Sequence, residues 1–191
     1  MNEYELCARI FSPRLRPANQ LRLEESKLKK KHTATIVMDG VDAWTLYRYD
    51  QDEDPDHFFP FFNNTRGENG SPEDLLKFCD YIVLVSKKDK LFVLLVEMKS
   101  GKPGDAGKQL EASKCFIQFV LKTANRIALT NGYENVDFTR VRIRKIVLKP
   151  QHKPATNIAK SKNKTPNQRI DWDADIVSLP SLTLPLYRFC K

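Results

Sequence analysis

The chain has 191 residues, of which 41% are hydrophobic and 29% charged, a composition typical of a globular protein large enough to bury a core. Its longest apolar run, residues 91–96, is too short to cross a bilayer, and the first residues lack the apolar centre of a secretion signal. The 32 Lys and Arg residues outnumber the 24 Asp and Glu residues, and the resulting net charge of +8 favours a polyanionic partner.

The four cysteines lie far apart in the sequence, at Cys7, Cys79, Cys115 and Cys190, and none forms a CxxC pair. We therefore expect neither a zinc site nor a dithiol redox motif. Unpaired thiols are typical of a reducing compartment, so we expect a cytoplasmic protein. Because the apolar runs are short, we expect no association with membranes.

The first third of the chain contains a predicted helix and a predicted hairpin. Residues 19–31 follow Pro17 and are expected to form a short polar helix that contains Glu24 and Glu25. Residues 32–50 contain two β-rich runs around Asp39-Gly40, a strong two-residue turn signal, and are expected to pair as a β-hairpin. An irregular connection and a short helix from Ser71 to Cys79 should follow.

The middle of the chain predicts a second hairpin and then a long helix. Residues 80–98 form two apolar runs separated by the charged turn Lys87–Lys90, so both strands should be central and covered on two faces. Apolar residues recur at helical spacing from Asp105 to Ala128, and Asn131-Gly132 would end that helix. Residues 140–149 should form a further strand.

The whole chain, residues 1–191, is predicted to be a single domain with its core at about residues 33–150. Residues 150–171 are rich in Lys, Asn, Pro and Thr, which favours a basic mobile loop. Residues 174–189 should form one or two broken strands at a sheet edge, because Pro180 and Pro185 cannot donate to a ladder.

Two acids are predicted to face each other in the second hairpin. A symmetric loop centred on Lys88-Asp89 places Asp80 directly opposite Glu97 on one face of the sheet, with Cβ atoms about 4.5–5.5 Å apart. Two like charges so close are costly near a core unless a cation binds both. Oxygen ligands suit Mg²⁺ or Mn²⁺, so Asp80 and Glu97 are predicted to bind such an ion, with the Met98 carbonyl as a further ligand.

A lysine follows this pair on the same face of the strand. Lys99 lies two residues after Glu97, and alternate residues of a strand share a face. A bound divalent ion lowers the pKa of an attacking water, and a lysine beside it can orient that water or stabilise the charge that develops on phosphate. The three charges therefore favour hydrolysis of a phosphodiester.

Two other interpretations of these three residues stay open. Glu-x-Lys is common, and the chain has a second example at Glu25-Ser26-Lys27, so a purely structural salt-bridged cluster would explain it. A nuclease-like scaffold that binds nucleic acid or a partner protein without catalysis is the other alternative.

The segments "CDYIVLV", "LLVEMKSG" and "KQLEAS" resemble the PD-(D/E)XK nuclease superfamily. By position, Asp80 matches the motif Asp, while Glu97 and Lys99 match the (D/E)-x-K pair. Gln109 matches a Gln that several branches carry on the next helix, and Cys79 stands where the family name has Pro. Some branches have a Glu of the first helix as an additional metal ligand, and Glu24 and Glu25 lie in a segment of that kind. The resemblance covers about residues 75–150.

This resemblance implies an α/β (α+β) fold of the restriction-endonuclease type, with a mixed central sheet flanked by helices in the order α-β-β-β-α-β. It also implies a Mg²⁺- or Mn²⁺-dependent endonuclease that acts on nucleic acid, with DNA favoured over RNA. No sequence-reading module is evident, so we expect targeting by a homodimer or a protein partner.

The predicted contacts with nucleic acid are basic residues outside the catalytic set. The block at residues 26–32 and the acid-free stretch at residues 140–169 would bind the phosphate backbone. The individual lysines predicted to make these contacts are Lys27, Lys29, Lys30, Lys31, Lys102, Lys108, Lys160, Lys162 and Lys164.

Overall fold

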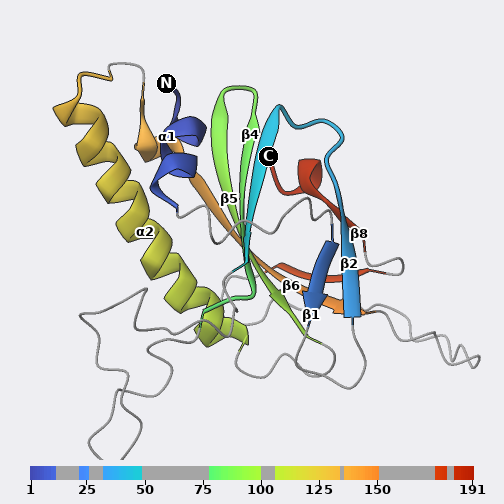
Figure 1. The fold of residues 1–191 in the computed structure, drawn as a ribbon. Helices are drawn as coiled ribbons and strands as arrows, with labels where there is room; N and C mark the ends of the chain where they lie inside the picture. The colour runs from blue at the N-terminus through green and yellow to red at the C-terminus, as the bar shows by residue number, and fades with distance from the viewer. Residues whose placement is uncertain are drawn as a thin grey trace, which may run out of the picture.

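The computed structural model of the chain describes residues 1–11, 22–25, 32–48, 78–99, 106–133, 136–150, 175–179 and 183–191. These residues form three layers (Figure 1). Helices α1 (Glu3–Ile10) and α2 (Ala106–Thr130) cover one face of a five-stranded sheet, and a three-stranded sheet covers the other. The predicted mixed α/β class is therefore confirmed.

The five-stranded sheet has the order β3-β4-β5-β6-β7. Strands β3, β4 and β5 are antiparallel neighbours, whereas β5, β6 and β7 run parallel. Parallel neighbours need a long crossover connection, and α2 lies between β5 and β6 in the chain. The strands are β3 (Ala43–Arg48), β4 (Tyr81–Lys87), β5 (Lys90–Met98), β6 (Arg142–Pro150) and β7 (Asp175–Leu179).

The second hairpin has the predicted register. Its ladder runs from Tyr81 opposite Val96 to Lys87 opposite Lys90. Lys88 and Asp89 form the turn with φ of 50° and 57°, the left-handed pair that a two-residue hairpin loop requires. Residues 81–85 and 91–98 are all buried, which confirms that these strands are central.

The three-stranded sheet corrects two predictions. Residues 22–25, expected to be helical, form strand β1 (Arg22–Glu25), which pairs with β2 (His32–Val37). Strand β2 also pairs in parallel with β8 (Thr183–Pro185), whereas β3 pairs with β4, so residues 32–50 do not form a hairpin. The turn at Gly40, with φ of 75°, is present, but β2 belongs to the three-stranded sheet and β3 to the five-stranded sheet.

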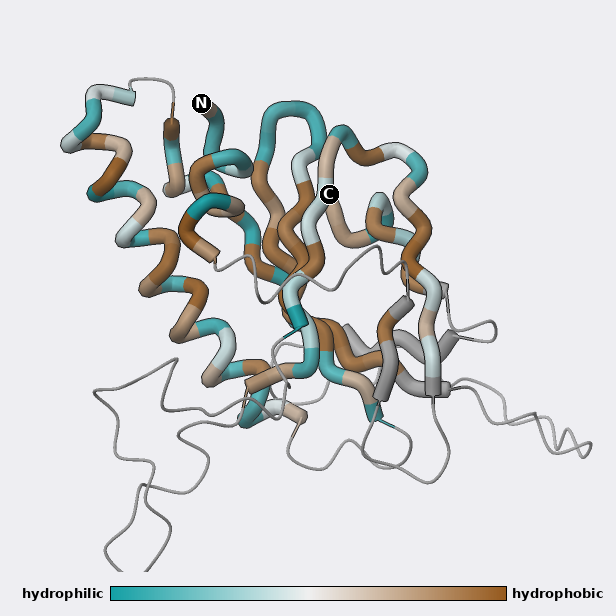
Figure 2. Tube along the Cα trace, in the orientation of Figure 1, coloured by the Kyte–Doolittle hydropathy of each residue, from teal (hydrophilic) through white to brown (hydrophobic). Residues whose placement is uncertain are grey.

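Strands β2 and β3 join different sheets because both faces of β4 and β5 are apolar and must be covered. Ile82 and Leu84 belong to a hydrophobic cluster with α1 and α2, while Val83 and Val85 belong to a second cluster with β1, β2 and β8. Figure 2 shows that the central strands are hydrophobic over most of their length. A β2–β3 hairpin in one sheet would leave the second of these faces uncovered.

The remaining elements agree with or extend the predicted ones. Helix α2 covers the predicted helix, and Gly132 follows it with φ of 68°. Strands β7 and β8 lie at sheet edges, as the prolines predict. Helix α1 and the short 3-10 helices η3 (Phe138–Arg140) and η4 (Leu186–Arg188) were not predicted, and the expected loop beyond Pro150 lies outside the described residues.

All four cysteines are described, and all four are free thiols, as expected. In the described ranges, no helix is both long and apolar enough to span a membrane.

Candidate functional site

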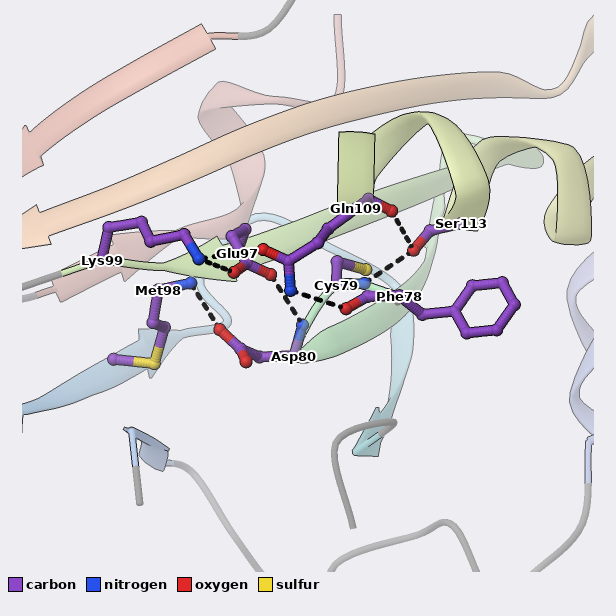
Figure 3. Close-up of polar contacts among 8 residues, drawn as sticks. All are labelled: Phe78, Cys79, Asp80, Glu97, Met98, Lys99, Gln109 and Ser113. Atoms are coloured by element: carbon purple, nitrogen blue, oxygen red, sulfur yellow. Dashed lines mark hydrogen bonds and ion pairs between the residues drawn. The ribbon is translucent and has the colours of Figure 1, made fainter. Parts of the chain in front are cut away.

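Two carboxylates lie at the open end of the β4–β5 hairpin (Figure 3). Asp80 directly precedes β4, so the ladder continued by one step places it opposite Glu97. The Asp80 Oδ2 accepts a hydrogen bond from the Met98 N–H at 2.6 Å, and the Glu97 Oε2 accepts one from the Asp80 N–H at 3.2 Å. Glu97 is only 1% exposed, whereas Asp80 is partly exposed. The pair therefore joins an interior acid to one at the surface.

Lys99 and Gln109 complete a polar network around Glu97. The Lys99 Nζ lies 2.6 Å from Glu97 Oε1 and donates to Gln109 Oε1 at 2.9 Å. The Gln109 Nε2 in turn donates to the Phe78 carbonyl at 3.2 Å. The amide of Gln109 therefore connects the lysine to the chain segment just before Asp80.

Ser113 anchors this network to the helix. Its Oγ accepts a hydrogen bond from the Cys79 N–H and donates one to the Gln109 carbonyl, both at 2.8 Å. Ser113 is fully buried and lies one helical turn after Gln109, on the same face of α2. Ser113 was not among the predicted site residues. The sequence could have indicated it, because it is a polar residue at a core position of the helix, four residues after Gln109.

Burial and charge repulsion act together on Glu97. Burial and the charge of Asp80 together raise the pKa of Glu97 to about 8, although the hydrogen bond and charge of Lys99 act in the opposite direction. Burial also raises the pKa of Cys79 to about 12, so this thiol stays neutral beside the two acids. The site therefore contains an acid whose charge one lysine does not fully compensate.

The residues present fit a hard divalent cation. Asp80 and Glu97 supply carboxylate oxygens, and the N–H and C=O of a residue in an antiparallel ladder face the same neighbouring strand. The Met98 carbonyl therefore leaves β5 on the side of Asp80, which accepts the Met98 N–H. Mg²⁺ commonly binds one or two carboxylates and keeps several waters. In the part of the chain that the structure describes, no group of three or more His, Cys, Asp or Glu side chains is placed to hold a metal.

The structure brings the predicted catalytic residues together and leaves most of the predicted binding residues undescribed. Asp80, Glu97, Lys99 and Gln109 are joined through the contacts above, while Lys108 is exposed on α2. Glu24 and Glu25 lie on β1, and nothing is described of their side chains. The predicted binding residues outside the described part are Lys27, Lys29, Lys30, Lys31, Lys102, Lys160, Lys162 and Lys164.

Comparisons with family models, with curated proteins and with solved structures yield no match to this chain. The chemistry of the site therefore rests on its own residues.

Proposed function

We propose that this protein is a metal-dependent nuclease that hydrolyses phosphodiester bonds, with Mg²⁺ or Mn²⁺ as its cofactor and DNA favoured over RNA. One observation carries this proposal: two facing carboxylates lie at a strand end, and the Lys99 ammonium lies 2.6 Å from one of them. Hydrolysis of a phosphodiester needs a cation to offset charge at phosphorus and a group that positions the water.

Each residue of the network has a role in this mechanism. Asp80, Glu97 and the Met98 carbonyl would hold the ion, which when bound would lower the pKa of the attacking water and offset charge on the phosphate. Lys99 would orient that water or stabilise the charge that develops on the phosphoryl oxygens. Gln109 would hold the Lys99 ammonium in place through the contact it makes at 2.9 Å.

The arrangement of the elements supports the same proposal. Helix α1, strands β3, β4 and β5, helix α2 and strand β6 follow one another in the order α-β-β-β-α-β around the large sheet, although β1 and β2 intervene between α1 and β3. This is the order that the resemblance to PD-(D/E)XK nucleases implies. The preference for DNA follows from that resemblance alone, because most of the superfamily cuts DNA.

A cleavage assay with matched variants tests the proposal. The purified protein would be incubated with plasmid, single-stranded DNA or RNA in Mg²⁺, Mn²⁺ or EDTA. We expect cleavage of at least one substrate with metal and none in EDTA, and no cleavage by Asp80→Asn or Glu97→Gln. The control is Asp89→Asn at the other end of the same hairpin, where φ of 57° suits asparagine. Cleavage by Glu97→Gln at the rate of this control would refute the assignment.

One observation favours the catalytically inactive alternative. Both carboxylates accept hydrogen bonds from backbone amides, and Lys99 pairs with Glu97, so the side chains satisfy one another. A protein that only binds nucleic acid or a partner would keep such a network for stability. It would then bind nucleic acid without cleaving it in any metal, which the same assay distinguishes.

A further inference from the structure

The turn end of the β4–β5 hairpin places two like charges face to face. Lys87 and Lys90 are directly opposite each other in the ladder. Such cross-strand pairs have Cβ atoms about 4.5–5.5 Å apart, and like charges at that position are destabilising. Neither lysine forms an ion pair with a carboxylate of the described residues. The hairpin thus keeps two like charges directly opposite each other beside its turn.

Two arginines extend this charge across the next strand. Arg142 and Arg144 lie opposite Phe92 and Leu94 in the parallel β5–β6 ladder. Alternate residues of a strand share a face, and Val85, Phe92, Leu94 and Ile146 all belong to the cluster that faces the three-stranded sheet. By the same alternation Lys87, Lys90, Arg142 and Arg144 lie on that face, and we call these four residues the turn-end basic surface.

Three of these four cations form hydrogen bonds with the last residues of the chain, which gives them a structural role. The Lys87 Nζ donates to the carbonyls of Tyr187 and Cys190 at 3.1 and 3.2 Å. Arg142 and Arg144 both donate to the main-chain oxygen of Lys191. The Tyr187 and Cys190 carbonyls carry no net charge, so they do not neutralise the Lys87 ammonium. Each guanidinium has five N–H donors, so Arg142 and Arg144 can donate to a further acceptor besides Lys191.

Lys90 has no such structural explanation. It is exposed, and its side chain makes no hydrogen bond or ion pair with the residues that the structure describes. The surface is nevertheless compact: burial raises the pKa of Cys190 to about 11, and the charges of both Lys87 and Arg144 act against that shift. Both cations therefore lie near the same thiol.

We propose that the turn-end basic surface binds the phosphate backbone of nucleic acid at a second contact, remote from the carboxylate pair. Strand β5 rises about 23 Å from Lys90 to Glu97, at about 3.3 Å per residue. Glu97 contacts the residues under α2, whereas the basic surface faces the three-stranded sheet. A phosphate held at the carboxylates therefore does not reach these cations, which would contact another part of the same nucleic acid.

The proposal rests on the proposed function only for the identity of the anion. Arginine pairs with phosphate through two parallel N–H donors, and duplex DNA carries one negative charge for about every 1.7 Å of its axis. That charge density favours DNA over an acidic polypeptide as the ligand for four cations on three adjacent strands.

The test is binding of labelled duplex DNA by the full chain in EDTA, where no metal-dependent cleavage occurs. Fluorescence anisotropy would give the affinity between about 50 and 200 mM salt. The variant Lys90→Gln/Arg142→Gln/Arg144→Gln should flatten the log–log salt dependence by about 0.9 for each phosphate that the protein no longer neutralises, up to about 2.7. A control with the same decrease in charge, Arg9→Gln/Lys122→Gln/Arg126→Gln, changes exposed cations of α1 and α2 and should keep the wild-type slope.

Further variants test the proposal if the triple variant folds poorly. Lys90→Gln alone removes no side-chain hydrogen bond or ion pair among the described residues and should lower the slope by about 0.9, while Arg142→Lys/Arg144→Lys keeps the charge and should keep most of the slope. An unchanged slope in Lys90→Gln, or equal decreases in the two triple variants, would overturn the proposal. Tighter binding of polyglutamate than of duplex would assign the surface to an acidic protein instead. If the protein binds duplex DNA through these cations but cleaves no substrate, the proposed binding surface stands and only the proposed nuclease function is refuted.

Discussion

Glu97 is an interior carboxylate whose ionised form is favoured by Lys99 and by the Asp80 N–H. Burial and Asp80 raise the pKa of Glu97 from 4.5 to about 8, and Lys99 at 2.6 Å opposes that rise. A divalent ion bound by both acids would favour the ionised form for the same electrostatic reason. Protonation of Glu97 and metal binding are therefore expected to compete.

The first prediction concerns stability as a function of pH without metal. An acid with a raised pKa in the folded state binds its proton more tightly when folded, so the folded chain holds more protons between pH 4.5 and about 8. The free energy of unfolding should therefore fall as pH rises through this window, by at most about 1.4 kcal/mol per pH unit. Urea unfolding in EDTA between about pH 5 and 8 measures this slope.

Glu97→Gln removes the titrating group and should flatten the dependence, while Asp89→Asn should keep it. A wild-type curve that stays level, or that Glu97→Gln follows in parallel, would show that Glu97 is not protonated in the folded state.

The second prediction separates Lys99 from the metal ligands. Lys99→Ala should reduce cleavage by about 10²–10³-fold, the range typical for removal of one group that stabilises transition-state charge. Binding of Mn²⁺ should persist or tighten, because the cation that competes for Glu97 is gone. Isothermal titration with Mn²⁺ and cleavage rates on one preparation give both values, with Lys122→Ala on the exposed face of α2 as the control. Failure of a folded Lys99→Ala chain to bind Mn²⁺ would mean that the lysine organises the metal site itself.

At the scale of elements, α2 is held on the sheet from two sides. Gln109 and Ser113 bind the segment before β4, and Glu111 pairs with Lys145 of β6. The two partners of that ion pair differ in burial, because Lys145 is 6% exposed and Glu111 is 49% exposed. Loss of either partner therefore has a different consequence.

The third prediction uses this asymmetry. Glu111→Gln removes the carboxylate of Glu111 from the buried Lys145 ammonium and should cost about 2–3 kcal/mol, less than for fully buried pairs because Glu111 is half-exposed. Lys145→Met leaves an acid that water can reach and should cost less, and the double variant should recover most of the stability that Glu111→Gln removes. Urea unfolding of the wild type, the two single variants and the double variant gives the coupling energy of the pair as a double-mutant cycle. A larger decrease in Lys145→Met would show that packing of the lysine stem, and not its charge, holds α2.

The elements also show which features local sequence can predict. Continuous apolar runs and the two-residue turn gave the β4–β5 register, and that register placed Asp80, Glu97 and Lys99 together. The capping box of α1, Asn2 with Glu5, was a local signal of a helix start, although that helix was not predicted.

Other features depend on segments far apart in the chain. Strand β2 pairs with β8, whose residues lie near the other end of the sequence, so the turn at Gly40 could not reveal that β2 and β3 join different sheets. Ser113 and Lys145 help to hold α2 in place because the helix packs on β5 and β6 and contacts the segment before β4, which periodicity within α2 does not specify.

At the scale of the whole molecule, charges of opposite sign occupy opposite ends of one hairpin. The acidic pair Asp80 and Glu97 lies at the open end beside α2, and the opposed lysines Lys87 and Lys90 lie at the turn. The excess of 32 basic over 24 acidic residues is thus compatible with a local acidic site. For the proposed nucleic-acid substrate, the basic turn end would attract phosphate, whereas a phosphate beside the carboxylate pair would need a bound cation.

The fourth prediction follows from the position of that pair, which joins β4, β5 and α2 through Asp80, Glu97 and Gln109. An ion that binds only the folded chain stabilises the whole fold by mass action, by about 2.7 kcal/mol at a concentration of 100 Kd. The Tm should therefore rise steadily with Mn²⁺ concentration in the wild type and in Asp89→Asn, and Glu97→Gln should lose this rise. Thermal unfolding followed by circular dichroism, with EDTA added back to reverse the effect, measures it. An equal rise in Glu97→Gln would place the bound ion elsewhere, and no rise in any variant would favour a network whose three charges only stabilise each other.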